Sequence, residues 1–464
     1  MQPIASDVIV RPTMQGSGSL RAPTAERPSG WCAWYAALML AAANALAFVD
    51  RQVLALLVPP IEADLHISDT RMSLLLGLSF TVLQALAGLP LGRLADVSSR
   101  RNIVALAVFC WSLTTGLCGT AGAYWSMFAA RVGIGASEAG LTPSAHSMLA
   151  DYFPRERLPA AMGLYAMGIY VGNGLALLAG GWIMAVAAQS GSVLGALHGW
   201  RVVFLVLGVS GMLFAAALLT VREPDRRQSA RQARIPLQQV WLQIRARGGA
   251  YGGICLAFCL MILVGAGTGA WIPTFFVRRF GWSLAEVGTY YGSAVLVFGT
   301  AGAWCGGWLA QSLRRRGVMD ANLRASLLGF MALVPFAVAY PLVADPRLAV
   351  TLVAGFNFFA GFPFGGGYAA LQELTPGRMR GQVAAIFTLL VNVIGGLGPT
   401  VVALFTNYVF RDERALPKSL ALTAAVAMPF GIAALWSAVR HYRAAVQAVA
   451  EIGLPCDEIT QKTV

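Results

Sequence analysis

Long apolar runs separated by short polar connections are the main pattern of this sequence. A helix that spans a bilayer needs roughly 20 mostly apolar residues, and these runs are close to or above that length. The third and fourth runs are continuous, and we place the turn between them at Gly119, Gly122 and Tyr124. The pattern predicts an all-α membrane protein with twelve spans, at about 32–58, 72–91, 103–122, 124–149, 160–188, 202–221, 251–276, 284–310, 325–344, 348–371, 382–409 and 419–439.

Basic residues are distributed unevenly between the two sets of connections. With both termini on one side, that side holds 24 of the 34 Lys and Arg residues and the opposite side holds 8. Because basic residues concentrate on the cytoplasmic side of membrane proteins, the sequence predicts that both termini are cytoplasmic. The preference for Arg over Lys suggests a GC-rich genome, and we expect the cytoplasmic membrane of a bacterium.

The longest internal connection divides the spans into six and six. It is polar and basic and contains an amphipathic stretch from Pro236 to Ile244, which is either a tether along the inner membrane surface or part of an unstructured linker. The first residues are rich in Pro, Ser, Gly and Thr, and we expect a disordered tail rather than a cleaved signal peptide. The predicted segments are a tail at 1–30, a six-helix bundle at 31–221, a linker at 222–250, a second bundle at 251–443 and a tail at 444–464.

Composition agrees with a membrane protein. Hydrophobic residues make up 57% of the chain and charged residues only 12%, against roughly 25% charged in soluble proteins. The net charge of +13 comes from short basic clusters between apolar runs, whereas a nucleic-acid-binding surface needs a continuous basic stripe. We therefore expect no nucleic acid partner.

Four charged residues interrupt the apolar runs. Asp50 and Arg51 lie in the first run, and Arg131 and Glu138 lie in the fourth. A charge at the bilayer centre costs about 2.5–3.5 kcal/mol on insertion scales, so four charges without partners would cost about 10–14 kcal/mol. Ionisable residues inside a membrane usually mark a substrate or proton pathway, so this cluster predicts a transporter.

The two halves of the chain repeat each other. Residues 92–101 (GRLADVSSRR) follow the second run, and residues 307–316 (GWLAQSLRRR) follow the eighth at an offset of 215. A second repeat pairs residues 151–154 (DYFP) with residues 373–376 (ELTP). Duplicated halves of this kind place a substrate site at their interface, near the midplane of the membrane.

The first repeat resembles the loop motif of the major facilitator superfamily, G-x-x-x-D-R-x-G-R-R. It keeps Gly92, Asp96, Arg100 and Arg101, but Val97 replaces the usual arginine and a serine replaces the usual glycine. The resemblance implies a cytoplasmic gate in which Asp96 pairs with arginines across that side. Asp151 and Glu373, from the second repeat, belong to the same gate. The alternative is a basic loop that serves only to fix topology.

Within that superfamily the chain resembles the Spinster-like branch. The matching segments are 48–52 (FVDRQ), 59–62 (PPIE), 67–69 (ISD), 131–140 (RVGIGASEAG) and 395–400 (GGLGPT). The resemblance implies that Asp50, Arg51, Arg131 and Glu138 form the proton-coupling and substrate set. It also implies an amphipathic lipid substrate such as a lysophospholipid or a sphingoid-like molecule.

The spacing of these residues suggests specific roles. Arg131 and Glu138 are seven residues apart and share one face of a helix, about 10 Å apart. We expect an ion pair between Asp50 and Arg131. Glu138, buried without a dedicated partner, would then be the acid that takes up a proton. The alternative is a static salt-bridge cluster that orients the helices.

Other polar residues in the runs are weaker candidates. His146 follows Glu138 by eight residues and is either a proton relay or a packing residue. Most amides and hydroxyls in membrane helices join neighbouring helices. The candidates to line a cavity are Asn44, Gln84, His146, Tyr165, Tyr170, Asn173, Tyr290, Asn357, Asn392 and Asn407.

Other chemistries lack the residues they need. The segment 135–140 (GASEAG) has Ala139 at the last position of the G-x-S-x-G nucleophile motif and lies within a helix. Cys255 and Cys259 are one turn apart but have no nearby histidine or carboxylate to complete a metal site. The phosphate-binding motif G-x-x-x-x-G-K-[ST] is absent, so ATP does not drive the protein directly. We expect no cofactor and no metal.

The sequence therefore predicts a proton-linked secondary transporter, and not an enzyme. We expect a monomer that alternates its two six-helix bundles around one site, with protons and membrane lipids as its other partners. A small organic anion is the alternative substrate, since Arg51 and Arg131 together suit a carboxylate. An intramembrane enzyme that modifies lipids is a more distant alternative, and a channel fits the repeat poorly.

Overall fold

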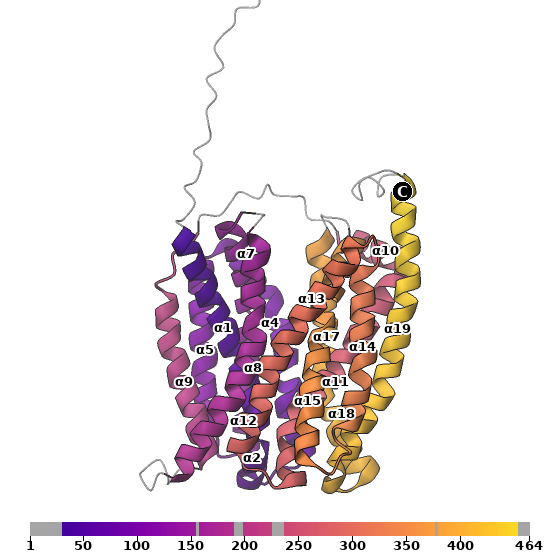
Figure 1. Ribbon diagram of the computed structural model, residues 1–464. Coiled ribbons are helices and arrows are strands. Elements are labelled where there is room, and N and C mark those ends of the chain that lie inside the picture. The colour runs from indigo at the N-terminus through magenta and orange to yellow at the C-terminus, as the bar shows by residue number, and fades with distance from the viewer. Residues whose placement is uncertain (1–29, 155–156, 190–197, 225–235, 376–378, 453–464) are drawn as a thin grey trace, which may run out of the picture.

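The computed structural model describes residues 30–154, 157–189, 198–224, 236–375 and 379–452. In these ranges every regular element is a helix, which confirms the predicted all-α membrane fold. Figure 1 shows the helices standing side by side in two groups, with the start of α1 and the end of α19 at the same end of the bundle. The predicted tail at 1–30 lies outside the described residues except for Gly30, where α1 begins.

The first group of helices follows the first six apolar runs. The predicted turn at residues 119–124 is correct, since α5 ends at Thr120 and α6 begins at Tyr124. The helices are α1 (Gly30–Leu56), α2 (Val58–Leu65), α3 (Asp69–Leu76), α4 (Leu78–Val97), α5 (Arg100–Thr120), α6 (Tyr124–Glu138), α7 (Leu141–Tyr152), α8 (Leu158–Gln189) and α9 (Gly199–Leu218).

The second group begins after a short helix, α10 (Leu237–Ala246), which covers the predicted amphipathic stretch. The group consists of α11 (Gly248–Phe280), α12 (Leu284–Ala294), η2 (Val295–Gly299), α13 (Thr300–Arg315), α14 (Ala321–Ala339), α15 (Pro346–Gly361), α16 (Pro363–Leu374), α17 (Arg380–Gly396), α18 (Gly398–Leu404), η4 (Phe405–Phe410), η5 (Glu413–Ala415) and α19 (Leu416–Ile452). The last helix continues past the expected end of the bundle at 443, as far as Ile452.

Eleven helical segments of the described chain are long and apolar enough to cross a membrane. The remaining predicted span, the fourth along the chain, is not among these eleven because it is interrupted. Its first part, α6, ends at Glu138, its second part, α7, begins at Leu141, and neither has 18 residues. The interruption lies next to Glu138, so the regular α-helix is broken beside one of the charged residues.

Glycines allow several of the long helices to pack closely. A Cβ atom at Gly172 of α8 would lie 2.2 Å from the carbonyl oxygen of Ala45 in α1, so only glycine fits this contact. Gly181 of α8 faces α12 in the same way, 2.8 Å from the carbonyl oxygen of Leu284. Small residues at helix contacts are typical of membrane bundles. Through these contacts α8 packs against both groups.

The two groups of helices meet at the end of the bundle opposite to the start of α1. There α8 contacts α12, α3 contacts α18, and α4 contacts α17. Figure 1 shows the purple and orange groups converging towards the end marked by α2 and separating towards the end marked by α7 and α10. We call these the α2 end and the α10 end.

Candidate functional site

A buried ion pair joins α1 and α6. The Arg51 Nη2 group contacts Glu138 Oε1, and Arg51 Nε lies 3.4 Å from Glu138 Oε2. Gln84 of α4 adds a third contact, since its amide nitrogen lies 3.4 Å from Glu138 Oε1. Glu138 is buried, whereas the Arg51 side chain is 29% exposed. The site thus presents one reachable guanidinium that is held by a buried carboxylate.

Arg131 binds the main chain rather than a carboxylate. Its Nη1 donates to the backbone carbonyl of Asp50 at 3.3 Å, and its Nε donates to the carbonyl of Leu75 at 3.3 Å. The guanidinium is fully buried. Among the described residues no ion pair joins Arg131 to the Asp50 side chain, so the predicted Asp50–Arg131 pair is wrong.

Asp50 is the acid of the cluster with an unsatisfied atom. It is 2% exposed, and its Oδ1 has no hydrogen-bond partner among the described residues. The expectation that Glu138 lacks a dedicated partner is therefore also wrong, since Glu138 has Arg51. The physical reason is that neighbouring residues on a helix point about 100° apart. Arg51 faces Glu138, and Asp50 does not.

Two phenylalanines complete the cluster, and the sequence analysis missed them. The Arg51 guanidinium lies 4.8 Å from the ring centroid of Phe48 and 4.4 Å from that of Phe80. The Arg131 guanidinium lies 5.6 Å from the same Phe80 ring. Both arginines therefore interact with the Phe80 ring, and cation–π attraction offsets part of their mutual repulsion. The positions of Phe48 and Gln52 in the sequence, on either side of Arg51, gave no signal that rings lie close to the guanidinium.

Glycines of α6 set these distances. A Cβ atom at Gly135 would lie 2.3 Å from the carbonyl oxygen of Phe80, and one at Gly133 would lie 2.9 Å from Thr114 Cγ2. These glycines let α4 and α5 approach α6 closely. The close approach of α4 is what places the Phe80 ring beside Arg131.

Some of the weaker candidates serve packing. Asn44 donates to the backbone carbonyl of Tyr165 at 2.8 Å, which joins α1 to α8. The Tyr165 hydroxyl lies 3.3 Å from Thr142 Oγ1, and the His146 ring meets Tyr165 edge-on at 5.2 Å between centroids. The described contacts of His146 do not include Glu138, so they give no support to a proton relay.

The remaining candidates are more scattered. Tyr170 lies at the interface of the two groups, because a Cβ at Gly299 of η2 would come 2.8 Å from its ring. Asn357 donates to Val353 in its own helix, and the ring of the exposed Tyr290 lies 5.2 Å from that of Trp282. Asn173 is half-buried and Asn392 is exposed. Their role as cavity-lining residues stays a prediction.

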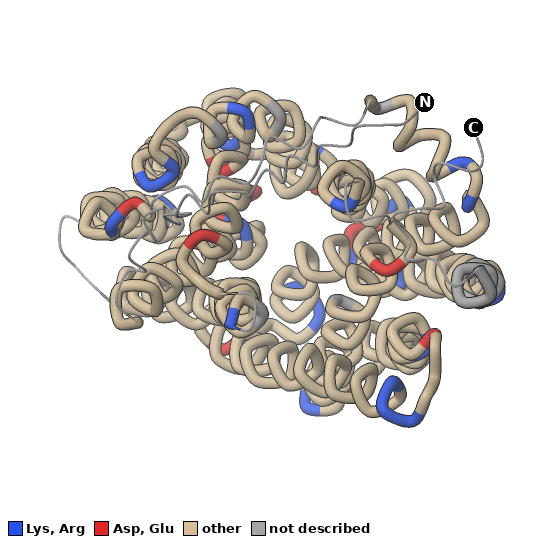
Figure 2. Tube along the Cα trace, turned by 90° about the horizontal axis from the view of Figure 1, so that it is seen from above, with Lys and Arg blue, Asp and Glu red and all other residues tan. Residues whose placement is uncertain are grey.

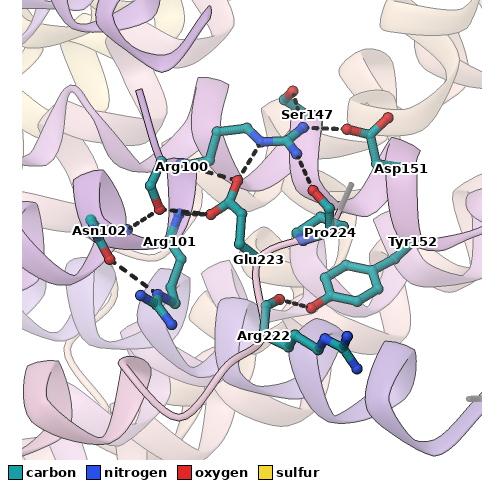
Figure 3. A network of polar contacts seen from close by, with 10 residues as sticks. Arg100, Arg101, Asn102, Ser147, Asp151, Tyr152, Arg222, Glu223 and Pro224 are labelled. Carbon is teal, nitrogen blue, oxygen red and sulfur yellow. Dashed lines mark hydrogen bonds and ion pairs between the residues drawn. The ribbon is translucent and has the colours of Figure 1, made fainter. Parts of the chain in front are cut away.

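A second charged network lies at the α10 end of the first group (Figure 3). The buried Arg100 pairs with Asp151, another residue of the predicted gate, and its Nη1 also donates to Ser147 Oγ at 2.9 Å. Glu223 is the unexpected member. It accepts from Arg100 Nε at 3.0 Å and from the backbone N–H groups that open α5.

Glu223 combines the roles of helix cap and ion-pair partner. Its carboxylate accepts from the Arg101 N–H at 2.7 Å and from Ser99 Oγ at 3.0 Å. Burial alone would raise the pKa of Glu223, but the hydrogen bonds from Arg101, Arg100 and Ser99 outweigh it and lower the pKa. A carboxylate directly after the sixth apolar run was the only sequence signal for this residue.

The other gate residues are placed less fully. The Arg101 side chain donates to Asn102 Oδ1 at 3.0 Å and stays near the end of α5. Gly92 has open space around it, since a Cβ there would meet no heavy atom within 4 Å. The side chain of Asp96 lies outside the described part of the structure, so its pairing across the α10 end stays a prediction.

The second half repeats the first at this end. Glu373 pairs with Arg314 and accepts from Asn322 Nδ2 at 3.1 Å and from the Tyr442 hydroxyl. The Arg314–Glu373 pair thus joins the same two repeated motifs as Arg100–Asp151. Both networks stay within their own half. The Arg100 and Arg314 pairs therefore stabilise each half separately at the α10 end.

Bonds between the halves occur towards the α2 end. Arg278 of α11 pairs with Glu62 and Asp69, and Asn407 donates to Thr70 Oγ1 at 2.9 Å. Ser73 Oγ lies 3.4 Å from Thr400 Oγ1, and Gln52 donates to the Gly269 carbonyl at 3.2 Å. Figure 2, viewed along the helices, shows that the few charged positions include several on helices near the centre of the molecule. The halves are therefore bonded to each other towards the α2 end.

Within the described residues, no group of three or more His, Cys, Asp and Glu side chains is placed to hold a metal ion. The chemistry of the central cluster is that of paired charges. It can exchange a carboxylate partner of Arg51 for another anion, and it can take up a proton.

Comparison with known proteins agrees with this arrangement. The family model described as "Major Facilitator Superfamily" matches residues 40–399. An MFS-type efflux pump of Mycolicibacterium smegmatis is 29% identical over 89% of this chain and 94% of its own length. A probable galactarate/D-glucarate transporter of Bacillus subtilis is 23% identical over 81% of this chain and 86% of its own length.

Solved structures show the same fold. A bacterial homologue of the human lysosomal transporter Spinster, in an inward-facing and unoccupied conformation, matches with a TM-score of 0.72 and 25% identity. That match covers 91% of this chain and 99% of the other. A second structure of a bacterial Spinster homologue, in an inward-facing and occupied conformation, matches with a TM-score of 0.72 and 26% identity. That match covers 89% of this chain and 97% of the other.

Proposed function

This chain belongs to the major facilitator superfamily and is a multi-pass membrane transporter, and from that premise we propose that it is a proton-linked secondary transporter working by alternating access. The observation that carries the proposal is the buried Arg51–Glu138 pair, which closes a cluster of two acids and two bases on α1 and α6. The static-cluster alternative assigns the same pair to helix orientation alone, so the experiment below must separate the two.

The charge balance of the cluster suggests how protons and substrate are linked. Asp50 and Glu138 together offset Arg51 and Arg131, so the cluster is neutral when all four are charged. If an anionic group binds the half-exposed Arg51 in place of Glu138, one negative charge is left in excess inside the membrane. Excess charge there is costly, and one proton on a cluster carboxylate removes it. An anion and a proton therefore bind together.

The bonding pattern between the halves supports alternating access. The halves are bonded towards the α2 end, and their helices separate towards the α10 end (Figure 1). With both termini in the cytoplasm, as the basic residues predict, this is an inward-facing arrangement. In the opposite state we expect the α2-end bonds to break and the α10 ends to come together.

The proposed substrate is an amphipathic lipid with an anionic headgroup, of the lysophospholipid or phosphorylated sphingoid class. The resemblance of segments 48–52 and 131–140 to the Spinster-like branch, which implies an amphipathic lipid, supports this choice. So does the setting of Arg51, whose guanidinium lies close to both the Phe48 and the Phe80 ring. The guanidinium binds phosphate well, and the rings give an apolar surround for the first part of an acyl chain.

A small organic anion is the second candidate. Relatives include the probable galactarate/D-glucarate transporter, which supports a carboxylate substrate. Arg51 is again the group that binds it. Binding to purified protein in lipid nanodiscs, measured against a lysophospholipid, a hexuronate and a neutral sugar, distinguishes the two. Preference for the hexuronate overturns the lipid assignment.

The coupling test uses vesicles that contain the purified protein and an imposed pH gradient. Glu138→Gln fixes the uncharged form of the acid and frees Arg51. We expect this variant to bind substrate and to equilibrate it across the membrane, but not to accumulate it. Accumulation at the wild-type level would show that Glu138 does not carry the coupling and would favour the static cluster.

Glu286→Gln is the matched control for this test. Glu286 is an acid outside the cluster that caps the start of α12, and glutamine can keep that cap. Transport by this control should equal that of the wild type. If both variants lose accumulation equally, the loss is a general effect of altered folding and does not support the proposed role of Glu138.

We also propose that the protein is a monomer in the cytoplasmic membrane of a bacterium, with both termini inside. Single cysteines at positions 230 and 412, in a background without the seven native cysteines, test the orientation. The first should label only from the cytoplasmic side and the second only from the opposite side. Labelling of both from outside would contradict the twelve-span topology.

A further inference from the structure

The connection between the first and second spans ties the two halves together at the α2 end. On one side it is anchored to its own half through Asp64 of α2. Asp64 Oδ2 accepts from Arg201 Nη2 at 2.8 Å and from Trp200 Nε1 at 3.2 Å. His198 Nε2 lies 3.4 Å from the other carboxylate oxygen of Asp64. The start of α9 thus holds α2 in place.

On its other side the connection forms ion pairs with the second half. Arg278 of α11 binds Asp69 with both terminal nitrogens, Nη1 at 2.8 Å from Oδ2 and Nη2 at 2.7 Å from Oδ1. The same Nη2 lies 2.8 Å from Glu62 Oε2. The two-pronged contact with Asp69 is the strong geometry for a guanidinium and a carboxylate. Glu62 is a second carboxylate on an arginine that is already paired.

The charges of this trio do not balance when both acids are ionised. One guanidinium faces two carboxylates, so one negative charge is in excess. The Glu62 side chain is only 11% exposed, and its Oε1 has no hydrogen-bond partner among the described residues. A buried charge without a partner is costly, whereas a protonated carboxyl is neutral. Burial first, and then the neighbouring Asp69, raise the pKa of Glu62 to about 9.

We propose that Glu62 is a second proton-binding site, separate from the Arg51–Glu138 cluster, that is occupied while the α2 end is closed and loses its proton when that end opens. The inference rests on the proposed function only in that the two halves alternate. When Arg278 moves away with the second half, Glu62 enters water and its carboxylate is hydrated. Acid on that side therefore favours closure of the α2 end, which is the inward-facing state.

The sign and size of the effect follow from linkage. In the closed state the pKa of Glu62 is about 9, and in water a glutamate has a pKa of about 4.3. The closed state binds the proton more tightly, so its advantage is greatest below the lower value and declines as pH rises towards the higher one. Between them, the ratio of closed to open molecules should fall by up to about tenfold per pH unit.

Few other charged groups face Glu62. The helices α1, α3 and α11 pack against α2, and from them Asp69 and Arg278 reach the carboxyl. Glu413 of η5 acts on Arg278 from further away. His66, at the end of α2, and His198, beside Asp64, are the nearby histidines. Both are replaced by glutamine in the test background, so that no histidine remains at these two positions.

The test measures the opening of the α2 end directly. Spin labels at Ala63→Cys and Asp412→Cys, in a background without native cysteines, report the distance between the halves by double electron–electron resonance in nanodiscs. We expect the short-distance population of the parent protein to decline between pH 5 and pH 9. In Glu62→Gln the short-distance population should stay high at every pH. Asp69→Asn leaves Glu62 as the one carboxylate bound to Arg278. The short-distance population of this variant should therefore decline at lower pH than that of the parent protein.

Several outcomes overturn the assignment. The first is a Glu62→Gln protein whose short-distance population depends on pH as in the parent protein. The second is an Asp69→Asn protein whose short-distance population declines at the same pH as in the parent protein. If Glu138→Gln abolishes the pH response and Glu62→Gln does not, the titrating group belongs to the transport cluster, and the proposed function survives without this site. If the Glu62 response remains but vesicle transport is independent of the pH gradient, the proposed function fails and the α2-end site stands.

Discussion

Gly77 offers a direct way to push the two halves apart. It stands between α3 and α4, in the contact that α4 makes with α17. A Cβ atom there would lie 2.0 Å from the carbonyl oxygen of Gly396 and 3.1 Å from its carbonyl carbon. Both of these atoms are backbone, so no side chain can turn aside. To move from 2.0 Å to the 3.4 Å of ordinary contact, the two helices must part by about 1.4 Å.

The size of the effect follows from the cost of overpacking. An extra methyl group in a tightly packed contact costs about 1–3 kcal/mol. In Gly77→Ala this cost falls on the state in which α4 and α17 touch, and the state with the α2 end open does not bear it. Since about 1.4 kcal/mol is a tenfold change, the ratio of closed to open molecules should fall by roughly 5- to 150-fold.

The label pair at positions 63 and 412 measures this ratio at a single pH. Gly88→Ala is the matched control, because Gly88 lies on α4, which begins directly after Gly77, and a Cβ there would meet no heavy atom within 4 Å. We expect the control to match its parent and Gly77→Ala to lengthen the distance. A ratio within twofold of the parent, or a shift towards closure, would refute the argument that these backbones hold the halves together.

Three further predictions concern single residues. Glu223→Gln removes the charge that faces Arg100 and replaces one of the two oxygens that cap α5 with an amide nitrogen, which cannot accept, so it should lower the free energy of unfolding by about 1–2 kcal/mol at pH 7 in a chemical denaturation assay. Because the folded-state pKa of Glu223 is lowered, its contribution is complete above the ordinary value of 4.5 and is lost as pH falls through the folded value; the variant should therefore lose less stability than the wild type between pH 6 and pH 3. Gly135→Ala places a methyl group 2.3 Å from the Phe80 carbonyl and should cost about 1–3 kcal/mol in the same assay, whereas Gly163→Ala, in open space, should cost little. Asp50→Asn should cost less than about 1 kcal/mol, since the Asp50 carboxylate has no guanidinium partner to lose; a loss of about 3–5 kcal/mol would restore the Asp50–Arg131 pair.

Elements and local repeats of this protein follow from the sequence because they depend on short stretches of chain. Apolar runs of bilayer length form helices whatever lies beside them, so the bounds of α5, α9 and α14 lie close to the predicted runs. The repeated motifs also come together in the same way at the α10 end of each half. Arg100 meets Asp151 and Arg314 meets Glu373 because each motif follows a fixed position in the same helical unit.

Partners within the central cluster were decided by the tertiary structure. The sequence places Asp50 and Arg51 next to each other, and a rotation of about 100° around α1 decides which of them faces α6. That rotation is set by contacts made elsewhere along the helix, such as the passage of α8 across Ala45 at Gly172. As a result of this packing, Glu138 pairs with Arg51, and Arg131 donates to main-chain carbonyls. Both guanidinium groups lie close to the Phe80 ring.

The α2-end trio depends on an even longer range of packing. Glu62 and Asp69 are visible in the sequence as two acids in a short connection, and Arg278 as one of two arginines after the seventh run. More than 200 residues separate them along the chain. The sequence determined that these charges stand at helix ends. Only the packing of α11 against α1 and α2 brought two acids to one arginine, and with it the excess charge that a proton can remove.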